Sequence, residues 1–133
     1  MKKKILVVDD EVAFTRTLKM NLERTGQYEV RVENFAQDAL KAAKEFKPDL
    51  IILDVIMPAE FGGDIAAKLR ADPEFVHTPI VFMTAYVKRY RVEEHEGYIS
   101  GYPFIAKPAS IEEIISVIEK HLTEKKKENE HNE

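Results

Sequence analysis

The sequence contains no cysteine among its 133 residues. This absence excludes a disulfide framework and thiolate metal sites. The sequence also lacks a hydrophobic run near the ~18 residues that a membrane span requires. The basic start at Met1–Lys4 is followed by only a short apolar stretch, Ile5–Val8, which is too short for the core of a signal peptide. We therefore expect a cytoplasmic protein that does not enter a membrane.

Basic residues are outnumbered by acidic ones. The chain has 20 Lys and Arg against 24 Asp and Glu, a net charge of −4. Binding to nucleic acid requires clustered basic side chains, so we expect no direct nucleic-acid partner. Hydrophobic residues make up 44% of the chain and charged residues 33%, which is typical of one globular domain. We place that domain at residues 1–123 and interpret residues 124–133, all Lys, Glu, Asn or His, as a charged flexible tail.

Short apolar runs alternate with segments of helical periodicity along the chain. The runs are rich in β-branched residues and resemble strands buried in a parallel sheet. Gly26 marks a helix end, and spacings typical of capping boxes begin at Asn34 and Ser110. We expect strands at 5–8, 28–32, 50–53, 79–84 and 104–106, and helices at 11–25, 35–46, 65–71 and 111–122. This order predicts an α/β fold with a doubly wound parallel sheet and helices on both faces.

The segment between Thr84 and Lys107 is the least regular part of the pattern. It contains Gly97 and Gly101, and it has β-branched and aromatic residues where helices favour alanine and leucine. We therefore predict a short or irregular fourth helix there. Pro103 has no amide hydrogen for a ladder hydrogen bond, so the last strand should begin late and pair briefly.

Polar residues stand at the ends of four of the predicted strands or directly after them. They are Asp9, Asp10, Asp54, Thr84 and Lys107. Ligands of such folds bind beyond the carboxyl ends of the strands, so these side chains should converge on one rim of the sheet. Three neighbouring carboxylates repel one another unless a cation joins them, and oxygen-only ligands point to Mg²⁺. With a lysine and a hydroxyl beside the metal, phosphoryl transfer is the chemistry that fits best.

Each of these residues also has a purely structural interpretation. Asp10 could cap the first helix, and Asp54 could open a turn. Phe14 is in line with Leu18 and Leu22, so it could simply be a core residue. The joint arrangement is more specific than any single residue, because every member follows an apolar run that a parallel sheet would use.

The motifs that carry these residues resemble those of a known family. They are Val-Val-Asp9-Asp10-Glu, Leu-Asp54-Val-Ile-Met57-Pro58 with Gly62, Thr84-Ala85 and Lys107-Pro108. Together they are similar to the signature of two-component response regulator receiver domains, over about residues 4 to 122. The resemblance implies a flavodoxin-like fold in which a five-stranded parallel sheet is flanked by five helices.

The resemblance also implies a role for each matching residue. Asp54 would accept a phosphoryl group from a sensor histidine kinase or phosphotransfer protein. Mg²⁺ would be bound directly by Asp10, Asp54 and the main-chain carbonyl of Ile56, and through a water by Asp9. Lys107 and Thr84 would contact the phosphoryl oxygens, and Phe104 would be the aromatic switch residue that turns inward when Thr84 moves. The Lys107–Pro108 bond would be cis, and a downstream protein would read the switch. Phe14 lies four residues after Asp10 on the first predicted helix, beside the site, and from this position we expect it to contact the kinase.

Three alternatives stay open. A phosphatase of the haloacid dehalogenase type also uses an aspartyl nucleophile and Mg²⁺, but its second acid would stand at Ile56 and its cap domain has no room here. A degenerate receiver would bind partners without phosphorylation. The chain could also be the receiver segment of a longer regulator or hybrid kinase. We expect a stand-alone switch rather than an enzyme, present as a monomer or a weak homodimer.

Overall fold

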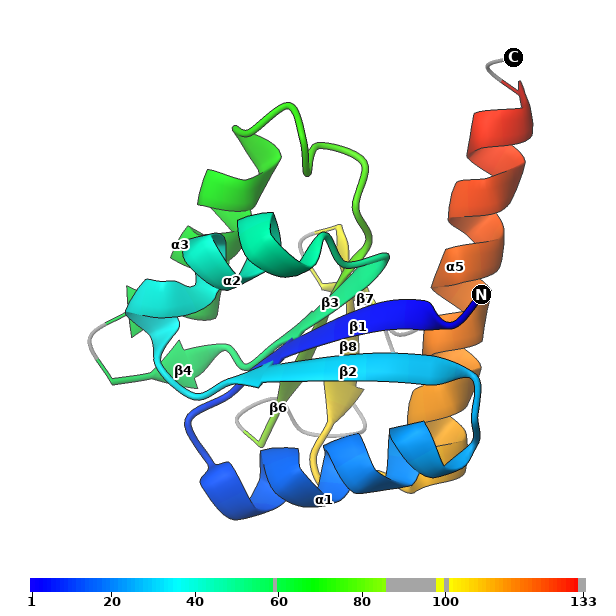
Figure 1. Ribbon diagram of the computed structural model, residues 1–133. Coiled ribbons are helices and arrows are strands. Elements are labelled where there is room, and N and C mark those ends of the chain that lie inside the picture. Colours follow the sequence, from blue (N-terminus) through cyan, green and yellow to red (C-terminus); the bar gives the residue numbers. More distant parts are fainter. Residues whose placement is uncertain (59, 86–97, 100, 132–133) are drawn as a thin grey trace.

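A computed structural model of the protein describes residues 1–58, 60–85, 98–99 and 101–131. Its main sheet has the strand order β2-β1-β3-β6-β8-β7, and a separate two-stranded ribbon pairs β4 with β5 (Figure 1). The strands are β1 Lys3–Val8, β2 Tyr28–Glu33, β3 Leu50–Leu53, β4 Ile56–Met57, β5 Glu60–Phe61, β6 Ile80–Thr84, β7 Tyr98–Ile99 and β8 Tyr102–Ala106. The helices are α1 Val12–Arg24, α2 Ala39–Phe46, α3 Gly62–Arg70 and α5 Ile111–His131, with a 3₁₀ turn η1 at Ala36–Asp38.

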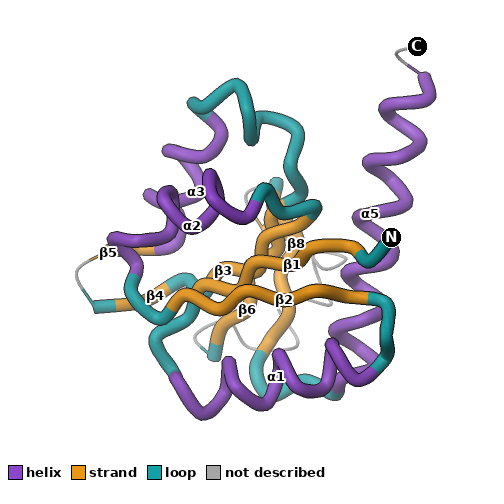
Figure 2. Tube along the Cα trace, in the orientation of Figure 1, coloured by secondary structure: helices purple, strands orange, loops and turns teal. Residues whose placement is uncertain are grey.

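Strands β2, β1, β3, β6 and β8 are parallel, as the sequence predicts. Helices α1 and α5 cover one face of this sheet, and α2 and α3 cover the other (Figure 2). The prediction of a doubly wound five-stranded parallel sheet is therefore confirmed. The two-residue strand β7 extends the sheet by pairing antiparallel with β8, which the sequence did not suggest.

The core consists of two apolar layers, one on each face of the sheet. Alternate residues of the central strands enter opposite layers, because successive side chains of a strand point to opposite faces. Leu6 and Ile51 pack with α2 and α3, whereas Ile5 and Ile52 pack with α1 and α5. Both faces are thus buried, which explains why the central strands are continuously apolar in sequence.

The predicted helix boundaries have mixed outcomes. Gly26 has φ +77° and follows the end of α1, as expected of a residue that terminates a helix. The Glu113 amide donates to Ser110 Oγ at 3.1 Å, which confirms that Ser110 caps α5. The capping box at Asn34 is wrong. Its side-chain amide donates instead to the Asp9 carbonyl at 2.7 Å and to Thr15 Oγ1 at 3.0 Å, and a 3₁₀ turn precedes α2.

The last strand and last helix differ in length from the prediction. Strand β8 begins at Tyr102, but its pairing with β6 starts only at Phe104, as expected from Pro103. Helix α5 continues to His131, so residue 123 is not a helix end. Lys and Glu are good helix formers, which accounts for the extension. The flexibility of residues 124–133 stays a prediction, and the predicted fourth helix lies outside the described residues. No helix in the described ranges is long and apolar enough to cross a bilayer.

Candidate functional site

The carboxyl ends of β1, β3, β6 and β8 bring the predicted site residues to one rim of the sheet. The register pairs Val8 with Leu53, so Asp9 and Asp54 follow neighbouring strands. Thr84 pairs with Ala106 at the end of β6, and Lys107 is the next residue. Three of these polar residues are nearly inaccessible, with exposed fractions of 2% for Asp9, 5% for Asp54 and 0% for Thr84.

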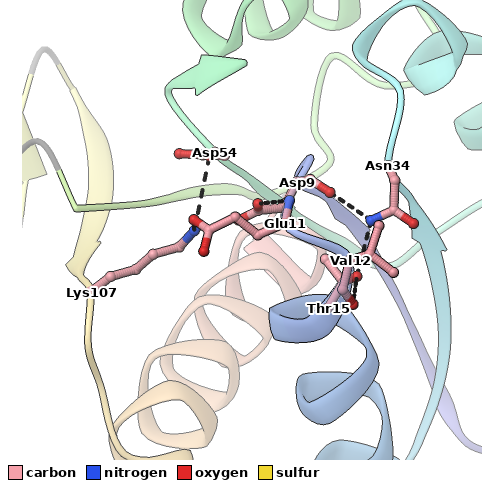
Figure 3. A network of polar contacts seen from close by, with 7 residues as sticks. All are labelled: Asp9, Glu11, Val12, Thr15, Asn34, Asp54 and Lys107. Carbon is pink, nitrogen blue, oxygen red and sulfur yellow. Dashed lines mark hydrogen bonds and ion pairs between the residues drawn. The ribbon is translucent and has the colours of Figure 1, made fainter. Parts of the chain in front are cut away.

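Lys107 connects the acidic residues of this rim (Figure 3). Its Nζ donates to Asp9 Oδ2 at 2.6 Å and to Glu11 Oε1 at 3.0 Å. The same nitrogen lies 3.9 Å from Asp54 Oδ2, which is an ion-pair distance but too long for a hydrogen bond. The lysine side chain is only 9% exposed and those of Asp9 and Asp54 are buried, so its charge interactions with these two are weakly screened by solvent.

The electrostatics of the rim disfavour negative charge on its buried carboxylates. The pKa of Asp54 is raised to about 6, mainly by burial, and the neighbouring charge of Asp9 raises it more than the charge of Lys107 lowers it. Burial also raises the pKa of Asp9, although its hydrogen bond from Lys107 acts in the opposite direction. Burial lowers the pKa of Lys107, but its bonds to Asp9 and Glu11 outweigh this effect and the net shift is upward. A positive charge added at this rim would therefore be favourable.

The acidic cluster differs in one member from the predicted set. Carboxylate oxygens of Asp9, Glu11 and Asp54 all lie within 4.8 Å of one another. Glu11 was missed, although its position two residues after Asp9 was a usable signal, since its amide donates to Asp9 Oδ1 at 2.9 Å. Asp10 is exposed, and its charge adds to the upward shift of the Asp54 pKa. Asp10 does not cap α1, because the N-cap residue is Glu11 and no side chain caps that end.

The loop after β3 holds Asp54 through a close backbone contact. The Gly62 amide donates to the Val55 carbonyl at 2.7 Å. A Cβ atom at residue 62 would overlap the main-chain carbonyl oxygen of Asp54, so only glycine fits there. Ile56, whose carbonyl the resemblance implies as a metal ligand, lies two residues beyond Asp54 in β4 and pairs with Phe61.

The predicted switch residues lie on adjacent strands. The buried Thr84 accepts a hydrogen bond at its main-chain carbonyl from the Lys107 amide, at 3.0 Å. Phe104 is half-buried, and its ring is stacked on Phe82 with a centroid separation of 5.0 Å. The Lys107–Pro108 peptide bond is cis, as the resemblance implies.

Phe14 borders both the core and the acidic rim. It is half-buried against the core layer of α1 and α5, and Lys107 Nζ lies 4.3 Å from the centroid of its ring. A groove of about 460 Å³ beside it is lined by residues of α1 and α5 and by Lys107. Another cavity, of about 570 Å³, is lined by Arg70, His77 and His121 and by none of the predicted site residues.

The residues of the rim fit a hard divalent cation. Their donor atoms are carboxylate oxygens, with no sulfur or imidazole in the cluster. The raised pKa of Asp54 indicates that negative charge is under-compensated there. This combination agrees with the acidic Mg²⁺ pocket that receiver domains use.

Comparison with known proteins gives the same family. The family described as "Response regulator receiver domain" matches residues 5–119. Over 123 residues the chain is 29% identical to the polar-differentiation response regulator DivK of Brucella anthropi, covering 92% of this chain and 98% of DivK. It is 45% identical over 85 residues to the alkaline phosphatase synthesis transcriptional regulatory protein PhoP of Bacillus subtilis. That match covers 64% of this chain but only 34% of PhoP.

A solved structure supports the assignment at the level of the fold. A CheY-like response regulator receiver domain protein from Methanospirillum hungatei has a TM-score of 0.81 and 25% sequence identity, and the match covers 96% of this chain and 99% of that one. Receiver domains are phosphoacceptor switches of two-component systems that interact with histidine kinases and downstream targets. On its motifs, its fold and these matches, the chain belongs to the response regulator receiver domain family.

Proposed function

We propose that Asp54 is the phosphoacceptor of this receiver domain. The observation that supports this assignment best is that an ionisable carboxylate is buried at the rim of the sheet, beside a lysine. Asp54 is a nearly inaccessible carboxylate that directly follows a buried strand, with Lys107 Nζ 3.9 Å from its Oδ2. Keeping a carboxylate buried in this way costs stability, and such perturbed ionisable groups are concentrated at functional sites.

In the proposed step, an Asp54 carboxylate oxygen attacks the phosphorus atom of the donor. A new O–P bond forms, and the bond from phosphorus to the leaving group breaks. With a phosphohistidine donor this is a P–N bond, whose electron pair returns to the imidazole. Lys107 then donates hydrogen bonds to the phosphoryl oxygens, and Thr84 offers its hydroxyl to one of them. When Thr84 moves, Phe104 turns inward, and a downstream protein recognises this change.

Mg²⁺ would be held by Asp10, Asp54 and the carbonyl of Ile56, with Asp9 acting through a water. When bound, it neutralises charge on the incoming phosphoryl group and on the carboxylates. Asp9 and Lys107 are buried beside Asp54. The charge of Asp9 raises the pKa of Asp54, and the charge of Lys107 lowers it. The proximity of the Asp9 and Asp54 carboxylates supports this cation site, and the exposed position of Asp10 leaves its side chain accessible to a metal.

For the partner, we propose a histidine kinase or phosphotransfer protein that contacts Phe14 and the groove between α1 and α5. That groove opens beside Lys107, so a partner placed there would be close to Asp54. A cytoplasmic location, a stand-alone chain and a monomeric or weakly dimeric state stay predictions. We further propose that the protein is a switch that turns over only its own phosphoryl group, rather than a phosphatase acting on external esters.

Labelling with a small phosphodonor such as acetyl phosphate tests the assignment. With Mg²⁺, intact mass measurement should show one added phosphoryl group on the wild type and none on Asp54→Asn. Peptide mapping should place the label on Asp54. Equal labelling of the variant would show that another residue is the acceptor. Sustained release of phosphate from a generic phosphate ester would instead favour the phosphatase alternative.

A further inference from the structure

Lys107 is held more closely by two other carboxylates than by Asp54. Its Nζ makes hydrogen bonds of 2.6 Å to Asp9 and 3.0 Å to Glu11, whereas Asp54 lies at 3.9 Å. The Phe14 ring adds a further contact, with its centroid 4.3 Å from the same nitrogen. The ammonium group is therefore bound on the Asp9 side of the site, away from the carboxylate that we propose as acceptor.

Among the residues that contact the Lys107 ammonium group, Glu11 is the one to which we have assigned no other role. It stands at the N-cap position of α1, but its side chain makes no capping hydrogen bond. Although the side chain is 58% exposed, its carboxylate reaches back to the buried ammonium group (Figure 3). A glutamate at this position could have its carboxylate in solvent, so the inward contact calls for an explanation.

We propose that Glu11 is a positioning residue that restrains Lys107 in the unphosphorylated protein. This proposal rests on the proposed phosphorylation of Asp54. To stabilise the phosphoryl group, Lys107 must exchange at least one of its present carboxylate partners for phosphoryl oxygens. Asp9 is buried beside both groups, whereas Glu11 is on the solvent side and is the partner that can be released. Glu11 thereby lowers the rate at which Asp54 is phosphorylated.

The expected effect is modest, because a charge pair with one exposed partner is weak. We expect Glu11→Gln to raise the initial rate of labelling by acetyl phosphate about two- to fivefold. Removing a negative charge near the site would also favour an anionic donor, so this variant alone is ambiguous. Glu11→Asp resolves the ambiguity, because it keeps the charge but shortens the side chain by one C–C bond, ~1.5 Å. If the contact is what matters, both variants are faster than the wild type.

Two controls separate the effect of the Glu11–Lys107 contact from the general electrostatic effect of removing a negative charge. Glu33→Gln removes the same charge at the end of β2, where the Glu33 carbonyl accepts from the Asp9 amide, and should leave the rate unchanged. Raising the ionic strength to about 1 M shortens the Debye length to about 3 Å and should suppress a field effect but preserve most of a direct one. A rate increase in Glu11→Gln and Glu33→Gln, with none in Glu11→Asp, would overturn the proposal.

A second measurement observes Lys107 directly, without phosphorylation. Lysine ammonium protons exchange rapidly with water unless hydrogen bonds retain them, so the Lys107 ¹⁵N–¹H signal should be broader in both Glu11 variants than in the wild type. An unchanged signal together with an unchanged rate would refute a restraint by Glu11. If the wild type is not labelled at all, the proposed function fails rather than the role of Glu11, and the ammonium signal still tests the contact.

Discussion

Burial has opposite effects on the apolar strands β1 and β3 and on the residues that directly follow them. At Ile5–Val8 and Leu50–Leu53 every side chain is apolar and no more than 1% exposed. One residue further along, Asp9 and Asp54 are carboxylates that are 2% and 5% exposed. Removing apolar groups from water stabilises the fold, whereas removing carboxylates from water destabilises it. The site therefore lies where the sheet stops contributing stability, next to the part that contributes most.

The largest effect should come from damaging the apolar region. Ile52 is 1% exposed and packs in the apolar layer that includes α1 and α5, so Ile52→Ala should lower the free energy of unfolding by about 3 to 4 kcal/mol. Urea unfolding followed by circular dichroism measures this loss. Val76→Ala is a matched control, because Val76 is 41% exposed and its truncation should cost little. A loss below about 1 kcal/mol at Ile52 would contradict the contrast, since a fully buried isoleucine should cost more.

At Asp54, by contrast, a substitution should raise the free energy of unfolding rather than lower it. A carboxyl group whose pKa in the folded state is about 6, above its ordinary value of 3.8, binds more protons folded than unfolded. Stability from this group therefore falls as the pH rises from about 4 to about 6, and the full cost remains above pH 6. In EDTA at pH 7.5, Asp54→Asn should raise the free energy of unfolding by roughly 3 kcal/mol, and at pH 4 by little.

The control for this reversal is Glu29→Gln, which neutralises an exposed acid on β2. It should change stability by less than about 0.5 kcal/mol at either pH, as surface substitutions do. If Asp54→Asn destabilised the protein at pH 7.5, the carboxylate would be a net stabilising group, and the comparison between the two regions would break down.

Phe14 lies at the border between the apolar core and the acidic rim. Its truncation should therefore lower the free energy of unfolding by less than Ile52→Ala does, and should also slow phosphoryl transfer. We expect Phe14→Ala to lower the free energy of unfolding by about 1 to 2 kcal/mol, because the side chain is only half-buried. Transfer from a phosphohistidine partner should slow about tenfold, as for a contact residue at an interface, while acetyl phosphate labelling is retained. Met20→Ala, an exposed position on the same helix, is the control and should change neither rate. Severe unfolding would assign Phe14 to the core alone.

Mg²⁺ should relieve part of the cost at the rim. A cation that binds only the folded protein stabilises it by about 1.4 kcal/mol at a free concentration ten times its dissociation constant. The Tm of the wild type should therefore rise with Mg²⁺. In Asp10→Ala the Tm without Mg²⁺ should hold or rise, because repulsion of Asp54 decreases, and the response to Mg²⁺ should shrink. Equal responses in both proteins would exclude Asp10 as a ligand.

Local sequence patterns were sufficient where one element decides the outcome. The apolar runs predicted the parallel strands, because a strand buried on both faces has no polar position. Gly26 and Ser110 act on their own helix ends, and both predictions are confirmed. The strand-end positions of Asp9, Asp54, Thr84 and Lys107 likewise placed them on a common rim, since parallel strands end at the same edge of a sheet.

Tertiary structure decided which partners the polar side chains adopt. Asn34 has the spacing of a cap, yet it bonds across to Asp9 and Thr15, because β1 and α1 come within its reach in the fold. The position of Glu11 two residues after Asp9 was a signal for its place in the acidic cluster. Its pairing with Lys107, which is 96 residues later in the chain and directly follows β8, depends on the tertiary structure. The order of residues determined where charge is placed, and the packing of distant strands determined which charges meet.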